Sequence, residues 1–489
     1  MKKAVLFLLP IFLFASCFFA GCGCAKKEKE RTRYEINAEY KPSDSTLTGT
    51  VKVDFYNAYD TEFTCLQFQL YPNAYRKGAL LSPIGYDVAL ESYYAGESYG
   101  EIGISSALGA SGFEVGGADK NLLFVYLEKP LAPEKRVTVD IGFSTRLAKV
   151  NHRLGITKTA VNFAGAFPVL CGYTQGGFYE CVPSDVGDAY YADAAEYTLH
   201  LTTPKEYTLV SGGRVLEERT LESKKRYTVS AMNARDLAFC MAKDYAFLQE
   251  KTGKTTVEYA YYQAKNSEEI IAFAQKAIAF YSSVFGEYPY DVLRLAQTSL
   301  THGQADGSGL CMIPEKWTVQ GELAGETAFE LAKLIAGEWW YSAVGANRME
   351  HPWLVDGLSA YSAALFFGKH DGYGVRKQEI IEKARAEYNA FRDGYQKALG
   401  WVDTRMSRPI SSFLNTYEYE NVVEHKSVVM FAELEKALGS KKFLSGLRKY
   451  YAENLFENAM PAHLVGAYER IGLDLHGFFD GYVNGKGTF

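Results

Sequence analysis

The chain has 489 residues, with 52 Lys and Arg against 58 Asp and Glu, so its formal net charge at neutral pH is -6. This length is sufficient for two or three domains. A nucleic-acid-binding protein usually carries a basic field that attracts phosphates, and this composition offers none. We therefore expect no nucleic-acid partner.

Residues 1–21 have the features of a bacterial lipoprotein signal peptide. Lys2-Lys3 precede an apolar run from Val5 to Phe19, and Ala20-Gly21-Cys22 follow it. This order of basic, apolar and small residues is typical of a secretory signal. A membrane-spanning anchor fits less well, because it needs about 20 apolar residues. We predict cleavage before Cys22, lipidation of Cys22, and a location on the extracytoplasmic face of a bacterial cell membrane.

Residues 34–247 show the alternation of polar and apolar residues that is typical of β-strands with one buried face. In residues 34–40, Tyr, Ile, Ala and Tyr alternate with Glu, Asn and Glu. The same period recurs in residues 51–55, 66–70, 137–141, 197–201 and 227–229. Antiparallel sheets commonly have one wet face. We predict a charged tether over residues 22–33, then an antiparallel β domain with a Gly- and Ser-rich loop at residues 96–117.

From residue 248 to residue 489 the apolar residues follow a helical period. The clearest helix begins at Ser267, where two Glu follow at the positive end of the helix dipole. Further helices are predicted over residues 327–341, 353–367, 373–399, 426–438 and 441–451. The predicted fold class is therefore α+β, with an amino-terminal antiparallel β domain and a mainly helical second domain.

The stretch Lys333-Leu-Ile-Ala-Gly337-Glu-Trp-Trp-Tyr341 has the spacing of a zinc-binding helix without its ligands. In H-E-x-x-H, two His one turn apart hold zinc, and the Glu activates the metal-bound water. In this stretch Lys333, Leu334 and Gly337 stand where such a motif has His, Glu and His. Eighteen residues separate Gly337 from Asp356, at the spacing of a third ligand.

These motifs, in this order, resemble those of the gluzincin aminopeptidases, the family of aminopeptidase N and the leukotriene hydrolases. The resemblance spans residues 32–485 and includes Phe285-Gly-Glu-Tyr-Pro-Tyr290, the Trp-Trp pair and Val423-Glu-His-Lys-Ser427. It implies a saddle-like β domain over residues 34–247 and a thermolysin-like peptidase domain over residues 248–489.

The resemblance also assigns roles that these residues no longer have the chemistry to perform. Lys333, Gly337 and Asp356 occupy the zinc-ligand positions, and Leu334 occupies the position of the general base. Glu424 stands where the family has the Tyr that stabilises the transition state. We therefore expect no catalytic residues and no zinc cofactor.

Two interactions near this motif are predicted. Asp306 stands at the position of the Glu that holds a substrate's amino group, so it is a candidate substrate-binding residue. A buried ammonium needs a partner, and an ion pair with Asp356 is one prediction for Lys333. The alternative is that Lys333 extends to solvent.

The function that we expect is that of a membrane-anchored pseudo-peptidase that binds a peptide or protein partner. The alternative is an active aminopeptidase or metallopeptidase that uses either non-standard chemistry or a displaced metal, for which His302, His351 and His425 are the candidate ligands. Cys171 and Cys181 flank a Gly-rich loop and are compatible with either a disulfide or two buried thiols.

The lipid anchor is testable with Cys22→Ser. Because each buried methylene of an acyl chain contributes about 0.8 kcal/mol to membrane binding, two or three chains should hold the protein on the membrane. The variant should be released or remain unprocessed, as measured by detergent partition and intact mass. An unchanged mass and partition would contradict lipidation at Cys22.

Overall fold

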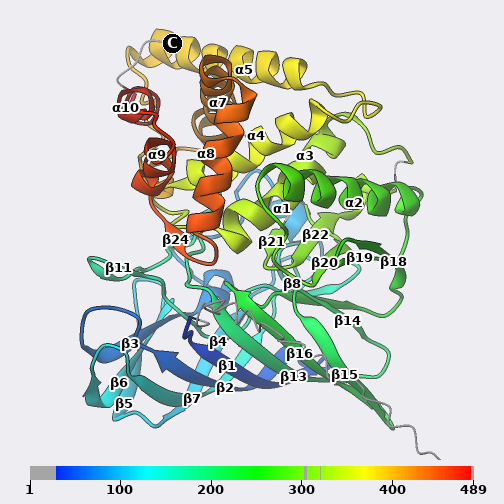
Figure 1. The fold of residues 1–489 in the computed structure, drawn as a ribbon. Helices are drawn as coiled ribbons and strands as arrows, with labels where there is room; N and C mark the ends of the chain where they lie inside the picture. The colour runs from blue at the N-terminus through cyan, green and yellow to red at the C-terminus, as the bar shows by residue number, and fades with distance from the viewer. Residues whose placement is uncertain (1–28, 302–304, 320, 486–489) are drawn as a thin grey trace, which may run out of the picture. The chain divides into compact units, whose positions relative to one another are not determined.

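We describe residues 29–301, 305–319 and 321–485 in a computed structural model (Figure 1). The predicted signal peptide and its Cys22 lie outside the described residues. Residues 29 and 30 belong to the amino-terminal segment, and the chain from Arg31 onward forms one compact unit. No helix among the described residues has the length and the apolar character needed to cross a membrane.

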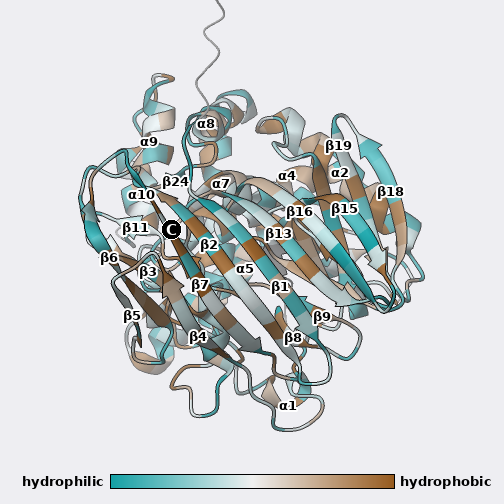
Figure 2. Cartoon of the chain, turned by 90° about the horizontal axis from the view of Figure 1, so that it is seen from below, coloured by the Kyte–Doolittle hydropathy of each residue, from teal (hydrophilic) through white to brown (hydrophobic). Residues whose placement is uncertain are grey.

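The largest element of the first half is a seven-stranded sheet with the order β15-β16-β13-β1-β2-β7-β4. Its strands are β1 (Arg33–Lys41), β2 (Thr46–Tyr56), β4 (Glu101–Leu108), β7 (Arg136–Arg146), β13 (Ala195–Pro204), β15 (Arg214–Leu221) and β16 (Lys224–Ala234). Every second residue of β13 is buried, as the period of two predicted. Figure 2 shows the other face of this sheet, where hydrophilic residues recur along the strands.

Two details of the predicted β domain were wrong. The strands β1 and β13 run parallel, with Arg33 beside Glu196 and Glu39 beside Thr202, so the sheet is mixed rather than antiparallel. The predicted loop at residues 96–117 contains β4 and β5 (Gly112–Gly116). Its Gly and Ser residues weakened the alternation on which the prediction depended, and β4 carries an irregularity between Ile104 and Ser106.

Smaller sheets complete the first half of the chain. One has the order β10-β3-β6-β5 and another the order β14-β17-β9-β8, and β11 pairs with β12. Their remaining strands are β3 (Phe63–Gln69), β6 (Leu122–Leu131), β8 (Leu154–Ile156), β9 (Val161–Phe163), β10 (Val169–Leu170), β11 (Tyr173–Thr174), β12 (Gly177–Phe178), β14 (Thr208–Ser211) and β17 (Phe239–Ala242). The short helices η1 (Tyr71–Tyr75) and α1 (Ala89–Ser92) lie between β3 and β4 in the chain.

The second half combines a five-stranded sheet with helices. The sheet has the order β18-β19-β20-β22-β21, and the predicted domain boundary between residues 247 and 248 falls inside β18. Its strands are β18 (Ala246–Thr252), β19 (Thr255–Tyr261), β20 (Val292–Thr298), β21 (Ala305–Gly307) and β22 (Leu310–Pro314). The main helices are α2 (Ser267–Val284), α3 (Gly325–Gly337), α4 (Asp356–Phe367), α5 (Lys377–Leu399), α7 (Lys426–Leu438), α8 (Ser440–Glu453), α9 (Pro461–Glu469) and α10 (His476–Val483). The predicted starts of α2 and α7 are confirmed.

Arg235 joins the two halves of the chain from a fully buried position. Its guanidinium donates to the carbonyl oxygens of Ala192 (3.2 Å), Tyr341 (2.7 Å) and Glu457 (2.8 Å), and to Oδ1 of Asn458 (2.6 Å). Ala192 precedes β13, Tyr341 follows α3, and the other two lie between α8 and α9. One side chain therefore satisfies polar groups from three distant segments.

Arg235→Leu should lower the free energy of unfolding by about 3 kcal/mol or more, because each buried acceptor left without a donor costs about 1–3 kcal/mol. Arg219→Leu is the matched control, since Arg219 contacts Glu217 on the surface and should cost at most about 0.5 kcal/mol. Urea unfolding measures both. Equal effects would contradict the role given to Arg235.

Candidate functional site: a buried ion-pair network

The residues of the site come from three helical segments: α3, the first turn of α4, and the turn that precedes α7. The helix α3 carries Glu330 and Lys333, which face the same side because three residues separate them. Asp356 opens α4, and Glu424 lies in the π-helical turn η6 (Glu420–His425) that leads into α7. A second π-helical turn, η3 (Glu338–Ala343), follows α3 directly. Such turns are rare and occur frequently at functional sites.

Lys333 is held between two carboxylates. Its Nζ lies 2.8 Å from Oε2 of Glu330 and 2.9 Å from Oε2 of Glu424, and the side chain is 13% exposed. The predicted ion pair between Lys333 and Asp356 was wrong, and so was the alternative in which Lys333 extends to solvent. The prediction did not consider Glu330, which lies one turn before Lys333 on the same helix and binds its ammonium.

Asp356 has different partners. Its Oδ1 lies 2.9 Å from a guanidinium nitrogen of Arg348, and Tyr419 donates its hydroxyl to Oδ2. The same Arg348 lies 2.8 Å from Asp188, which also binds Arg153 at 2.6 Å. Because Asp188 and Arg153 belong to the first half of the chain, this row of charges links the β-rich part to the start of α4.

Burial and neighbouring charges act in opposite directions on these groups. Burial favours the neutral form of Lys333, but the carboxylates of Glu330 and Glu424 outweigh it and hold its pKa above the usual value. Burial raises the pKa of Glu424 to about 7, and the neighbouring carboxylate of Glu330 acts in the same direction. The ammonium of Lys333 acts to lower this pKa but is outweighed. Burial also acts to raise the pKa of Asp188, but Arg153 and Arg348 outweigh it and lower that pKa to about 2.

The remaining residues of the predicted site lie on α3 and on β21. Leu334 and Gly337 are buried on α3. Asp306 lies on β21, paired with Cys311 of β22, and its side chain is outside the described part. Cys171 and Cys181 are free and buried, and burial raises the pKa of the Cys181 thiol to about 12.

Several members of the site escaped sequence reasoning. Asp188, Arg348 and Tyr419 lie outside the motifs that the sequence analysis describes. Glu330 had a readable signal, because an acid three residues before a Lys on a helix is a common ion pair. The link from Asp188 to Arg348 spans 160 positions in the chain, and no local pattern predicts it.

The donors present do not fit a catalytic zinc. Such a site takes three protein ligands with available lone pairs, whereas Lys333 presents an ammonium and Gly337 has no side chain. The third ligand position, Asp356, is engaged by Arg348 and Tyr419. Glu424, at the position of the Tyr, is engaged by Lys333.

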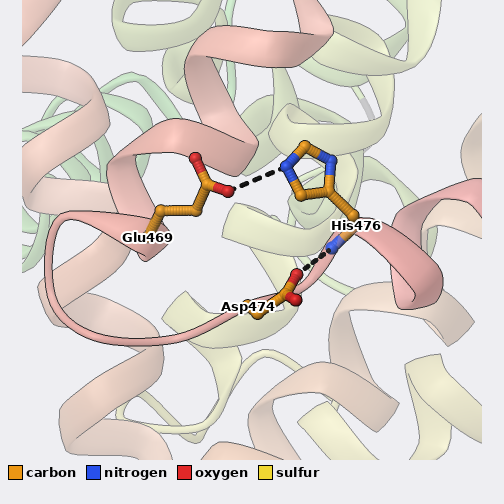
Figure 3. Close-up of side chains that lie close together, drawn as sticks. All are labelled: Glu469, Asp474 and His476. Atoms are coloured by element: carbon orange, nitrogen blue, oxygen red, sulfur yellow. Dashed lines mark hydrogen bonds and ion pairs between the residues drawn. The ribbon is translucent and has the colours of Figure 1, made fainter.

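The proposed alternative ligands do not form a metal-binding group in the described residues. His302 lies outside them, and burial lowers the pKa of His425 to about 4 and also lowers that of His351. Among the described residues, the one group of three potential ligands is the exposed set Glu469, Asp474 and His476 on the α9–α10 connection (Figure 3). His476 Nε2 lies 2.8 Å from Glu469, and Asp474 accepts the backbone N–H of His476 at 3.1 Å, so local contacts account for these side chains.

The fold is that of the two-domain M1 zinc metallopeptidases. The structure of an M1 zinc metallopeptidase from Deinococcus radiodurans matches with a TM-score of 0.64 and 13% identity over 94% of this chain and 96% of that chain. A mutant of the Deinococcus radiodurans enzyme bound to a Tyr-Ser-Ala substrate matches with a TM-score of 0.63 and 15% identity over 94% and 95%. No protein-family model and no curated protein matches the sequence. Identities of this size establish the fold alone.

The pH dependence of stability tests the raised pKa of Glu424. The pKa of Glu424 is about 7 in the folded protein against an ordinary value of 4.5, so its stabilising contribution is complete below pH 4.5 and is lost as the pH rises through 7. Between pH 5 and pH 8 the wild type should lose about 2 kcal/mol of unfolding free energy relative to Glu424→Gln, at about 1.4 kcal/mol per pKa unit. Glu222→Gln, on a surface turn, is the control. A constant difference between wild type and Glu424→Gln at all pH values would contradict a raised pKa of Glu424 in the folded protein.

Proposed function

We propose that this protein is a lipid-anchored, extracytoplasmic pseudo-peptidase, in which an ion-pair network has replaced the zinc centre and which binds a peptide or protein partner without hydrolysing it. The observation that carries the proposal is the position of Lys333 between Glu330 and Glu424. By the family resemblance, Lys333 stands at the first zinc ligand and Glu424 at the transition-state Tyr.

Electrostatics supports the loss of metal chemistry. An ammonium whose pKa is raised by two carboxylates has no lone pair for a metal and repels a second cation. Removal of one member of such a buried network typically costs about 3–5 kcal/mol, because the partner charge is left uncompensated. Loss of Lys333 or of either carboxylate should therefore destabilise the fold.

The sequence of residues 1–33 supports the location. The lipidated Cys22 and the charged tether would keep the folded part beside the membrane, since an extended chain spans at most about 3.5 Å per residue. A protein fixed at the membrane surface with a peptidase fold and no catalytic metal is suited to capture polypeptides there.

The second candidate function is a hydrolase without zinc. It is favoured by Glu424, whose pKa of about 7 suits a general acid or base that works at neutral pH. If the wild type cleaves aminoacyl or peptide substrates, and if Glu424→Gln or Asp306→Ala abolishes the cleavage, this candidate replaces the first.

Restoring the motif tests whether the site descends from a zinc centre. The variant Lys333→His, Leu334→Glu, Gly337→His, Asp356→Glu should bind zinc, as measured by calorimetry. It should remain a poor aminopeptidase, because Glu424 lacks a phenol and the loss of one oxyanion donor costs about 10²–10³ in rate. Addition of Glu424→Tyr should raise its activity.

Two results would contradict this reading. The absence of zinc binding in the fourfold variant, when circular dichroism shows that it is folded, would mean that the positions assigned to the ligands are wrong. Aminopeptidase activity in the unmodified protein would mean that the site has kept a working chemistry.

A further inference from the structure

The segment of residues 79–92, which contains α1, exposes large apolar side chains. Leu80 is 73% exposed, Tyr86 97% and Leu90 95%. Scattered surface Leu residues are common, but a group of nearly fully exposed apolar side chains on one segment indicates an interaction surface. In Figure 2, α1 lies on a segment that extends beyond the labelled ends of β4 and β8.

This segment is fixed rather than loose. The buried carboxylate of Asp119 accepts the backbone N–H groups of Leu80 (2.7 Å) and Leu81 (3.0 Å) and binds Arg76 at 2.8 Å. Ile84, within the segment, is buried. The backbone of the segment is therefore anchored at Leu80 and Leu81.

A second segment, residues 183–187, lies beside the segment of residues 79–92 and contributes the carboxylate of Asp185. A β-carbon on Gly85 would lie 2.6 Å from Oδ1 of Asp87 and 3.6 Å from Oδ2 of Asp185, so both acids converge on this glycine. Asp87 and Asp185 are exposed. Residues 79–92 contain two acidic and no basic side chains, so Tyr86 and Leu90 have acidic neighbours in the chain.

The same second segment contacts the helical part of the chain. A β-carbon on Gly187 would lie 2.6 Å from Cδ1 of Ile410 and 2.9 Å from the ring of Tyr419, whose hydroxyl binds Asp356. Leu414, four residues after Ile410, is 74% exposed, and its backbone N–H is held by Glu418 at 2.7 Å. Exposed apolar groups thus occur on both segments that flank residues 183–187, next to the ion-pair network.

We propose that Leu80, Tyr86, Asp87, Leu90, Asp185 and Leu414 form a docking surface for an extended polypeptide segment in which basic residues alternate with apolar ones. The inference rests on the proposed function, and it names the chemistry of the ligand. The apolar side chains bury the ligand's apolar residues, and Asp87 and Asp185 pair with its ammonium or guanidinium groups.

The charge of the docking surface decides between this ligand and two others. An anionic lipid surface attracts basic patches, and three acids, Asp87, Glu91 and Asp185, oppose it here. A second copy of the chain, placed face to face across a two-fold axis, would bring Asp87 and Asp185 close to the same carboxylates of its partner. A polypeptide with basic and apolar residues is not repelled by these carboxylates.

The test uses the full-length chain in detergent and three labelled synthetic peptides, with alternating Leu and Lys, Leu and Glu, or Ser and Lys. Fluorescence anisotropy should show that the Leu–Lys peptide binds about tenfold or more tightly than the other two. Tyr86→Ser with Leu90→Ser should weaken its binding about tenfold. Asp87→Asn with Asp185→Asn should weaken it about fivefold and reduce its dependence on salt.

The matched control is Leu221→Ser with Glu222→Gln, which changes an exposed apolar residue and an exposed acid at the turn between β15 and β16. This variant should bind as the wild type does. If the Leu–Lys peptide binds but both docking-surface variants behave as the control, the docking surface is wrong while peptide binding stands. If no peptide binds the wild type, the docking surface is wrong, whereas the proposed function is tested separately by zinc content and by peptidase activity. Preferential binding to vesicles of phosphatidylglycerol would overturn the choice of a polypeptide ligand.

Discussion

One ammonium shared between two carboxylates determines the character of the site. Lys333 contacts Glu330 and Glu424 at hydrogen-bonding distance, with little exposure to solvent. The two carboxylates compete for one ammonium, and all three groups are largely removed from solvent. The protein responds through the pKa of Glu424, which rises to about 7, so the net charge of the site changes near neutral pH.

The second row of charges shows how the site is connected to the rest of the fold. Asp188 binds both Arg153 and Arg348, and Arg348 continues to Asp356. Each acid in this row has a cationic partner, and the row crosses from the β-rich part to the first turn of α4. Asp356, which the family resemblance places at the third ligand position, therefore takes part in the contact between the two halves of the chain. Arg235 is also buried, outside this row of charges, and joins the same two halves by donating hydrogen bonds to backbone carbonyl groups.

Sequence reasoning succeeded where the physical signal is local. The period of two located β1, β2 and β13, and the acidic start after Ser267 located α2. It failed where the determinant is remote in sequence or weak in pattern. The parallel contact of β1 with β13 joins residues 163 positions apart, and the glycines between residues 96 and 117 concealed β4 and β5. The spacing of the motif predicted that Lys333 and Asp356 would lie in one site, but it gave no information on which acids compete for the ammonium.

The central claim is that Lys333 and its two carboxylates have replaced a metal centre. The measurement that tests it most directly is the zinc content of the full-length protein after purification without chelators, determined by elemental analysis alongside Asp356→Ala. Both proteins should contain far less than one zinc per chain. Close to one zinc per chain in the wild type, lost in Asp356→Ala, would contradict the claim.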